Sequence, residues 1–447
     1  MLVIFSDLHL TDESTSSNVH ETAFKKILLP EITANAKNYN AQEIRVILLG
    51  DIFDLVRTDY WVSQVPDSER PWNGTLDPNT GMNTHSKVEV HYNNILDKIL
   101  KNHSGKALIE VLNSVKRDNV YTKVTYIIGN HDRALNVFDS LKDKVKSKIT
   151  NVDEVEFLNV LYAPEYSVLA RHGHEWDINN YGYEFYTKVL NRKANVNRFD
   201  SECYKTQTIG EVVTAELMAG FIYELKQQLG DTNPGLIKQL MEVNNVRPMT
   251  DAFLWIEWFG RNMLKDDKEK KIILQSLQKS LDNVLKTDLS KAWDNLVEEV
   301  FLLRGDLTDR FDQLNKFIKG KSFDDLKGSV ELFKFFEGIF GSSKDDYVEG
   351  SKKEWEFKPL NEIQYVLYGH THEARYDYFN ASVDGAVRMY INTGTYLPLI
   401  QRIDRNGFSS AYQLTMVFCY NDKEDQTDKR DGSSIEIWNG IKRKNYK

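Results

Sequence analysis

The sequence has few cysteines and no long apolar run. Its 447 residues include only two cysteines, Cys203 and Cys419, which lie far apart and match no metal-ligand spacing. This scarcity favours a reduced, intracellular protein. The apolar run from Leu2 to Phe5 is too short for a secretory signal and leads directly into an acidic motif at Asp7. No stretch reaches the roughly eighteen apolar residues that a membrane span needs. We therefore expect a cytoplasmic protein without a transmembrane segment.

The sequence also lacks an excess of basic residues. Its formal net charge is −9 at pH 7, which disfavours a broad nucleic-acid footprint but leaves room for a local basic groove. The hydrophobic fraction of 41% is normal for a packed globular chain, and we find no internal repeat or long low-complexity tract. The length suits one large domain with an insertion, or two or three ordinary domains.

Several short aliphatic or β-branched runs each end in a polar cluster. These runs are Leu2 to Phe5, Arg45 to Leu49, Val124 to Ile128, Val168 to Ala170, Tyr365 to Tyr368 and Met389 to Ile391. Continuous apolar runs of this length predict buried strands. Because ligands in α/β sheets bind beyond the carboxyl ends of the strands, we expect the polar side chains to converge at one edge.

The segments between these runs predict helices and one long loop. Helices are expected near Thr22 to Lys37, with a kink or break at Pro30, and from about His91 to Val115. The stretch from Thr58 to Ser86 shows few helix or strand signals, which favours a functional or mobile loop.

The stretch from residue 178 to residue 360 lacks the strand pattern and is expected to be helical. Thr208-x-x-Glu211 and Ser322-x-x-Asp325 resemble capping boxes. Apolar residues recur at helical spacing in three groups: Leu217, Phe221, Ile222 and Leu225; Leu254, Trp255, Trp258 and Phe259; and Ile273, Leu277 and Leu281. We expect residues 1–177 and 361–447 to form a catalytic core, with 178–360 as an α-helical insertion.

The insertion leaves and re-enters the core beside the polar motifs. A segment tethered in this way is well placed to form a lid or a substrate-selecting wall. Its large apolar residues include Trp255, Trp258, Trp293, Phe335 and Phe336. The alternative is that these side chains pack only against each other.

The polar clusters contain the residue types that a two-metal site needs. Two divalent metals can clamp the phosphoryl oxygens of an in-line displacement, and they need carboxylates, imidazoles and one bridging carboxylate. Asp7 and His9 leave a strand on the same side, Asp51 follows a glycine that allows a tight turn, and Asn130 offers a neutral amide oxygen. Six of the ten histidines fall inside these motifs: His9, His131, His172, His174, His370 and His372. Each motif alone is common by chance, but their joint occurrence favours a metal centre.

The motif series resembles that of the calcineurin-like metallophosphoesterase family. The motifs are Asp7-x-His9, Gly50-Asp51-x-x-Asp54, Gly129-Asn130-His131-Asp132, His172-Gly173-His174 and Gly369-His370-Thr371-His372. They occur in the family's order and cover roughly residues 1–177 and 361–400. The resemblance implies an α/β fold, a four-layer αββα sandwich, with two divalent metals at one sheet edge.

The resemblance also implies a role for each residue. Asp7, His9 and His372 would hold the first metal. Asn130, His172 and His370 would hold the second, and Asp51 would bridge the two. His131 would be the catalytic histidine, with Asp132 orienting it. Asp54 and His174 would support the ligands or contact the substrate.

Two features of the metal site stay open in the sequence. His172 and His174 both follow a predicted strand, and the family's preference for the first histidine favours His172 as the ligand. Oxygen and nitrogen ligands without thiolate suit Mn, Fe, Zn or Co.

Within the family, three segments look nearest to the UDP-diacylglucosamine pyrophosphohydrolase branch. They are Ser6-Asp7-Leu8-His9-Leu10, Gly50-Asp51-Ile52-Phe53-Asp54 and Asn392-Thr393-Gly394-Thr395. In that branch a helical insertion receives acyl chains. However, the branch usually has Arg where this chain has His131, and this insertion is much longer, so we take the branch as a structural relative only.

The sequence as a whole predicts a phosphoesterase that uses a metal-activated hydroxide. The bond cleaved would be a phosphomonoester, phosphodiester or pyrophosphate bond in a small or lipid-linked substrate. A nuclease or nucleotide-processing enzyme on the same metal site is one alternative. A non-catalytic scaffold that keeps the fold is the other.

Overall fold

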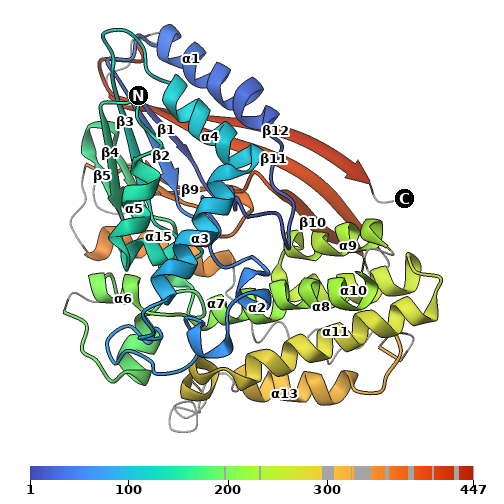
Figure 1. Cartoon of the computed structure of the whole chain (residues 1–447). Helices are drawn as coiled ribbons and strands as arrows, with labels where there is room; N and C mark the ends of the chain where they lie inside the picture. The colour runs from blue at the N-terminus through green and yellow to red at the C-terminus, as the bar shows by residue number, and fades with distance from the viewer. Residues whose placement is uncertain are drawn as a thin grey trace.

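The structure is a computed structural model in which most of the chain is described. The described residues are 1–195, 198–230, 233–293, 307–323, 325–326, 344–357, 362–380, 387–404, 407–426 and 432–445. They form a mixed α/β fold with two β-sheets (Figure 1).

The first sheet combines a parallel half with an antiparallel half. Its strands are β1 (Leu2–Phe5), β2 (Glu43–Leu49), β3 (Tyr121–Ile127), β4 (Glu154–Leu158), β10 (Pro398–Asp404), β11 (Gly407–Tyr420) and β12 (Ser434–Asn445). The order is β10-β11-β1-β2-β3-β4, with β12 paired along β11. Strands β1 to β4 run parallel, whereas β11 is antiparallel to β1, β10 and β12. The carboxyl ends of β1, β2 and β3 therefore meet at one edge of the sheet.

The second sheet has a parallel centre between antiparallel edges. Its strands are β5 (Leu161–Ala163), β6 (Val168–Ala170), β7 (Tyr365–Tyr368), β8 (Ala374–Asn380) and β9 (Val387–Thr393). Their order is β5-β6-β7-β9-β8, and β6, β7 and β9 run parallel. The residues after β6 and β7 therefore also leave the sheet at a common edge.

The two sheets pack face to face through aliphatic side chains. Ile4 and Ile47 from the first sheet share one buried cluster with Val168, Leu367 and Ile391 from the second. Such a dry interface between sheets is stabilised by removal of apolar surface from water, at about 25 cal/mol per Å² buried. This packing fixes the carboxyl-terminal edges of the two sheets relative to each other, and this determines where the site lies.

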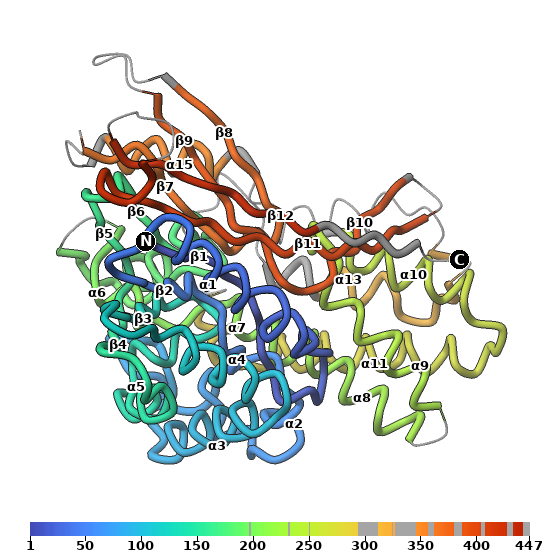
Figure 2. Tube along the Cα trace, turned by 90° about the horizontal axis from the view of Figure 1, so that it is seen from above, coloured from blue at the N-terminus to red at the C-terminus, as the bar shows by residue number. Residues whose placement is uncertain are grey.

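Helices cover the outer face of each sheet. The described α-helices are α1 (Leu29–Asn38), α2 (Tyr60–Ser63), α3 (Val88–Lys101), α4 (His103–Ser114), α5 (Asp139–Lys146), α6 (Ser201–Lys205), α7 (Ile209–Val212), α8 (Gly220–Leu229), α9 (Pro234–Leu240), α10 (Ala252–Asn262), α11 (Asp267–Lys286), α13 (Leu307–Ile318) and α15 (Lys344–Phe357). Helices α1, α3 and α4 lie on the side of the first sheet away from β7 and β9 (Figure 2). Helix α15 packs on the second sheet, where Tyr347 and Val348 join Val366 and Tyr390 in a buried cluster.

The six expected strands are present, and the two expected helices differ in detail. The helix expected over 91–115 is two helices, because Asn102 has an extended backbone and its side chain accepts a hydrogen bond from the Gly105 amide. Near Pro30, a π-helical turn at Phe24–Leu28 gives way to α1 at Leu29. The proline lies in the first turn of α1, and the π-helical turn directly before it continues into α1 with helical backbone at Leu28.

The described residues between 178 and 360 form helices and turns but no named strand, as expected. The three apolar groups at helical spacing are buried or half-buried. The capping box at Ser322 and Asp325 forms, with reciprocal backbone-to-side-chain bonds of 2.8 and 3.3 Å. The one expected at Thr208 does not, because the Thr208 side chain caps no backbone N–H and the Glu211 carboxylate pairs with Arg133.

The insertion and the core share one apolar cluster. Leu217 and Trp255 of the insertion belong to the same buried cluster as Phe5 and Ile95 of the core. The long helices α8, α10 and α11 extend this core beyond the edge of the sheets (Figure 1). Deletion of the insertion would therefore expose apolar surface on the rest of the chain.

The loop from Thr58 to Ser86 ties the insertion to the core. Trp72 is fully buried, and its Nε1 donates to Glu216 Oε1 at 2.7 Å. Arg70 Nη1 donates to the same oxygen at 2.9 Å. The loop therefore acts as a structural brace, although sequence patterns favoured a functional or mobile loop.

None of the described helices combines the length and the apolar character that a bilayer crossing requires.

Candidate metal centre

The polar motifs come together where the carboxyl ends of the strands from both sheets meet. Asp7 and His9 follow β1, Asp51 follows β2, and Asn130 and His131 follow β3. His172 and His174 follow β6, while His370 and His372 follow β7. One pocket is lined by Asp51, Asn130, His131, His370 and His372 together with residues of the insertion. The convergence expected from the strand pattern is confirmed.

Five of these residues have a left-handed backbone. Asp7, His9, Asp51, His370 and His372 have φ values of 50°, 41°, 54°, 68° and 63°. This conformation costs a non-glycine residue on the order of 1 kcal/mol or more, and it persists only where the surroundings enforce it. Backbone hydrogen bonds from Asp7 to Gly50 (3.0 Å) and from His9 to Asp51 (2.9 Å) supply part of that enforcement. Clustered strain of this kind is typical of functional sites.

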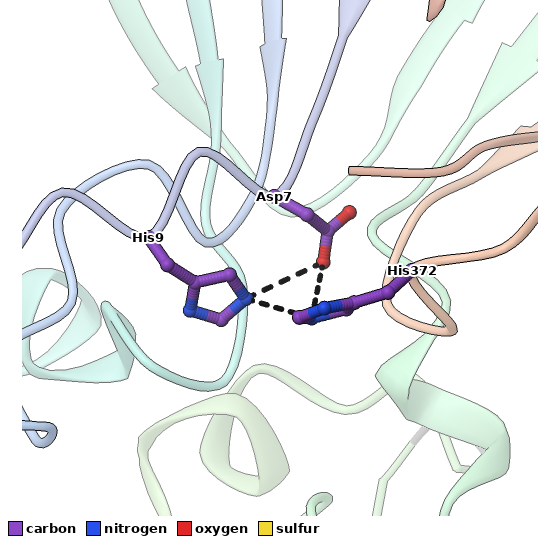
Figure 3. Close-up of side chains that lie close together, drawn as sticks. All are labelled: Asp7, His9 and His372. Atoms are coloured by element: carbon purple, nitrogen blue, oxygen red, sulfur yellow. Dashed lines mark hydrogen bonds and ion pairs between the residues drawn. The ribbon is translucent and has the colours of Figure 1, made fainter. Parts of the chain in front are cut away.

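The first group of ligand atoms comes from Asp7, His9 and His372 (Figure 3). The Nε2 atoms of His9 and His372 are 2.8 Å apart. Asp7 Oδ1 lies 3.7 Å from His9 Nε2 and 3.5 Å from His372 Nε2. Two imidazole nitrogens this close repel each other unless a proton or a metal ion lies between them. The three side chains are buried, so this corner of the site is built to surround a cation.

The second group comes from Asp51, His172 and His370, whose ligand atoms all lie within 4.8 Å of one another. His172 Nε2 is 3.2 Å from Asp51 Oδ2 and also 3.2 Å from Asn130 Oδ1. The other ring nitrogen, Nδ1, lies 2.9 Å from the carbonyl oxygen of Leu49. A hydrogen bond there fixes the ring and leaves Nε2 to face the site.

Asp51 joins the two groups through a single oxygen. Its Oδ2 lies 3.2 Å from His172 Nε2 and 3.6 Å from His9 Nε2. Its Oδ1 accepts a hydrogen bond of 2.9 Å from the His131 amide, which fixes the carboxylate. One carboxylate oxygen is therefore within reach of both groups of ligands.

The electrostatics of the second group favour positive charge. Burial alone would raise the pKa of Asp51, but the charges of His172 and His131 hold this pKa well below its usual value. Burial alone would lower the pKa of His172, but the Asp51 carboxylate raises this pKa to about 10. A position that holds a proton so firmly on an imidazole also favours a metal cation, which would displace the proton.

Two glycines leave space for these side chains. A Cβ on Gly50, which has a φ of +83°, would lie 2.2 Å from His172 Nδ1. A Cβ on Gly129 would lie 2.3 Å from Asp51 Oδ1. Any larger residue would push a ligand out of place, which explains glycine in both motifs.

His131 lies at the pocket wall, and its carboxylate neighbour is not the one expected. The expectation that Asp132 orients His131 is wrong. Asp132 accepts hydrogen bonds from the amides of Ile52 (3.0 Å) and Gly129 (2.5 Å) and from the Tyr126 hydroxyl (2.6 Å). Asp132 therefore connects the loop after β2 to the loop after β3, because its carboxylate accepts hydrogen bonds from backbone amides in both loops.

Asp54 takes the place expected for Asp132. Its Oδ2 lies 2.9 Å from His131 Nδ1 and 2.8 Å from His9 Nδ1. Burial lowers the pKa of His131, but the charges of Asp54 and Asp51 outweigh burial, and the net shift is upward. One buried carboxylate thus supports a ligand and the candidate acid together.

The structure separates His172 from His174. His172 belongs to the second group of ligand atoms, whereas His174 belongs to none of the groups found among the described residues. The His174 ring packs beside Tyr181 and Tyr204, and its Nδ1 lies 3.6 Å from Glu175. Burial lowers the pKa of His174 to about 4. His174 therefore remains a neutral packing partner of the ligands.

This difference predicts unequal effects of two matched substitutions. His172→Ala is expected to lower the affinity of the second group for a divalent metal by roughly 10- to 100-fold or more, because a candidate ligand is lost. His174→Ala should have a smaller effect, since only packing behind the ligands changes. Metal titration of both variants checks the order, and a larger loss in His174→Ala would contradict it.

Sequence patterns missed several residues of the site. Asp177 Oδ2 lies 3.1 Å from His370 Nε2, and Asn180 Oδ1 accepts a hydrogen bond from Asn130 Nδ2 at 3.3 Å. Asp177 follows the His172 motif closely, so its position in the sequence was a usable signal. Arg57 and Arg247 also line the pocket. Arg57 follows Asp54 by three residues, but Arg247 comes from the insertion and no local pattern marks it.

The insertion contributes one wall of the pocket. Its lining residues are Asn179, Asn180, Ile209, Gly210, Val213, Thr214, Met218, Arg247, Pro248, Met249 and Tyr347. The expectation that the insertion borders the site is confirmed. However, Trp255, Trp258 and Trp293 pack in the core and not on this wall. Phe335 and Phe336 lie outside the described residues.

Neither a scan against models of known protein families nor a search among characterised proteins finds a match for this chain.

Proposed function

We propose that this chain is a binuclear-metal-dependent phosphoesterase of the calcineurin-like type. The observation that carries the proposal is the position of Asp51 Oδ2, within 3.6 Å of His9 Nε2 and 3.2 Å of His172 Nε2. A carboxylate between two ligand groups is what a pair of adjacent divalent ions requires.

The side chains fit two metals of borderline hardness. Asp7, His9 and His372 would hold one, Asn130, His172 and His370 the other, with Asp51 shared. Oxygen and nitrogen donors without thiolate suit Mn, Fe, Zn or Co. The bound metals would supply Lewis-acid stabilisation of phosphoryl charge and activation of water.

The remaining residues of the pocket move a proton and hold the groups in place. His131 would donate a proton to a phosphoryl oxygen or to the leaving group, since it lines the pocket and belongs to neither the Asp7 group nor the Asp51 group, although it forms a third cluster of possible ligand atoms with His9 and Asp54. Asp54, 2.9 Å from His131 Nδ1, would orient the ring. The reaction is then hydrolysis of a phosphomonoester, phosphodiester or pyrophosphate bond.

The packing of the fold supports this assignment. Helices α3 and α4, two facing sheets and helix α15 follow one another in space, which agrees with a four-layer αββα sandwich. We also propose a cytoplasmic location, which is supported by the free, buried Cys203 and Cys419. The substrate would be a phosphorylated small molecule or a lipid-linked one.

Metal analysis combined with a substrate screen tests the proposal. The purified chain should bind close to two divalent ions and hydrolyse at least one of an aryl phosphate, an aryl phosphodiester and a pyrophosphate. Chelation should abolish activity, and added Mn²⁺ should restore it. Activity confined to DNA or RNA would indicate a nuclease, and failure to bind metal would indicate a scaffold.

A further inference from the structure

Arg57 brings a buried guanidinium to the pocket, and some of its N–H donors have no hydrogen-bond partner among the described residues. The residue is only 4% exposed, and within the described part of the chain its Nε and Nη1 have no hydrogen-bond partner. Its nearest carboxylate is Asp54, 3.5 Å from Nε. That carboxylate also faces His9 and His131 and accepts from the Arg57 amide at 2.8 Å. A buried cation with unsatisfied donors is costly unless a ligand completes its bonds.

Arg247 brings a second guanidinium to the same pocket from the insertion. Its backbone amide donates to the Ile400 carbonyl at 2.8 Å, which fixes the residue against β10. Its Nη1 donates to the carbonyls of Asn244 (3.0 Å) and Val246 (2.8 Å), and its Nη2 contacts His372 Nδ1 at 2.7 Å. These acceptors are neutral, so they orient the guanidinium without cancelling its charge.

The guanidinium groups of Arg57 and Arg247 line one pocket, although they come from different parts of the chain. Two like charges held in one buried pocket are unfavourable unless an anion lies between them or beside them.

We propose that Arg57 and Arg247 form an anion subsite for a second phosphate group of the substrate, distinct from the phosphate that is hydrolysed. This inference rests on the proposed function, which assigns the reacting phosphate to the Asp51 centre. Guanidinium donors in a planar fork match phosphate oxygens in geometry as well as charge. The second phosphate can be linked to the first through an anhydride or attached elsewhere on the substrate by an ester.

Three substrates separate these cases in the Mn²⁺-loaded chain. 4-Nitrophenyl phosphate has one phosphate, pyrophosphate has a second joined by an anhydride, and 1,3-propanediol bisphosphate has a second joined by an ester. Arg57→Gln and Arg247→Gln should each lower kcat/KM for at least one two-phosphate substrate by about 10- to 100-fold, mainly through KM. The loss for this two-phosphate substrate should exceed the loss for 4-nitrophenyl phosphate by about tenfold, because only the two-phosphate substrate uses the subsite. The two-phosphate substrate that responds identifies the linkage.

Binding without turnover gives an independent measurement. Methylenebisphosphonate cannot be hydrolysed at its bridging carbon, and its calorimetric affinity should fall by a similar factor in Arg57→Gln. Arg57→Lys should recover part of the loss, because the charge returns without the fork. Arg192→Gln is the matched control, since Arg192 is exposed and lies outside the pocket lining.

Three outcomes would contradict the inference or the proposed function on which it rests. Equal losses for one-phosphate and two-phosphate substrates would place the arginines on the reacting phosphate and overturn the subsite. Unchanged kinetics and bisphosphonate affinity in both folded variants, checked by thermal unfolding, would also overturn it. If the metal-loaded wild-type chain hydrolyses none of these three substrates and no aryl phosphodiester, the proposed phosphoesterase function fails before the subsite is reached.

Discussion

Asp51→Ala is expected to remove both metals and the hydrolytic activity together. Asp51 Oδ2 faces ligand nitrogens of both groups, His9 at 3.6 Å and His172 at 3.2 Å. Without this carboxylate each group loses a ligand, and the repulsion between the two cations is no longer compensated. Metal content should fall from close to two ions per chain to below one. Turnover should fall by about 10³-fold or more, since each metal contributes several kcal/mol.

Elemental analysis of dialysed protein measures the occupancy, and assays at saturating Mn²⁺ measure the turnover. Asp139→Ala is the matched control, because the Asp139 side chain is 89% exposed and distant from the pocket lining. Full metal occupancy in Asp51→Ala would show that the bridge is misplaced. Loss of only one metal would assign Asp51 to a single group.

His131→Ala is expected to keep its metals and lose turnover. His131 lines the pocket, and its Nδ1 faces Asp54, outside the Asp7 and Asp51 groups. Removal of a positioned acid typically costs about 10²- to 10⁴-fold in rate. The loss should be smaller for substrates with good leaving groups such as 4-nitrophenolate, because their departure needs less protonation.

Metal titration and steady-state kinetics on two leaving groups test this prediction together. His85→Ala is the control, since His85 is exposed. Loss of metal in His131→Ala would make this residue a ligand. Equal losses for good and poor leaving groups would favour a role in holding the phosphoryl oxygen, and full turnover would remove His131 from the mechanism.

The sequence was sufficient to predict which side chains meet. Each strand that positions the site is a short apolar run followed directly by a candidate ligand. The local sequence pattern therefore predicts both the strand and the residue at its end. The residues after β1, β2, β3, β6 and β7 were therefore predicted correctly as neighbours. The strands β4, β5, β8, β10, β11 and β12 were missed, because partly exposed strands mix polar and apolar residues.

The features that the sequence could not predict depend on contacts between segments that are far apart in the chain. Asp132 and Asp54 both follow a ligand motif, and only the structure shows that Asp54 faces His131 while Asp132 accepts from Ile52 and Gly129. Arg247 reaches the pocket because Val246 pairs with Ile400 of β10. Neither contact produces a periodic pattern in the sequence.

The apolar cluster shared by the insertion and the core has a consequence for how this protein could diversify. Leu217 and Trp255 are buried in the same cluster as Phe5 and Ile95, and Glu216 binds Trp72 and Arg70. The pocket wall therefore cannot be exchanged as a separate unit, because any replacement would also have to rebuild the shared hydrophobic cluster. New specificities are accessible mainly through single substitutions on the wall, at positions such as Val213 or Met218, which line the pocket.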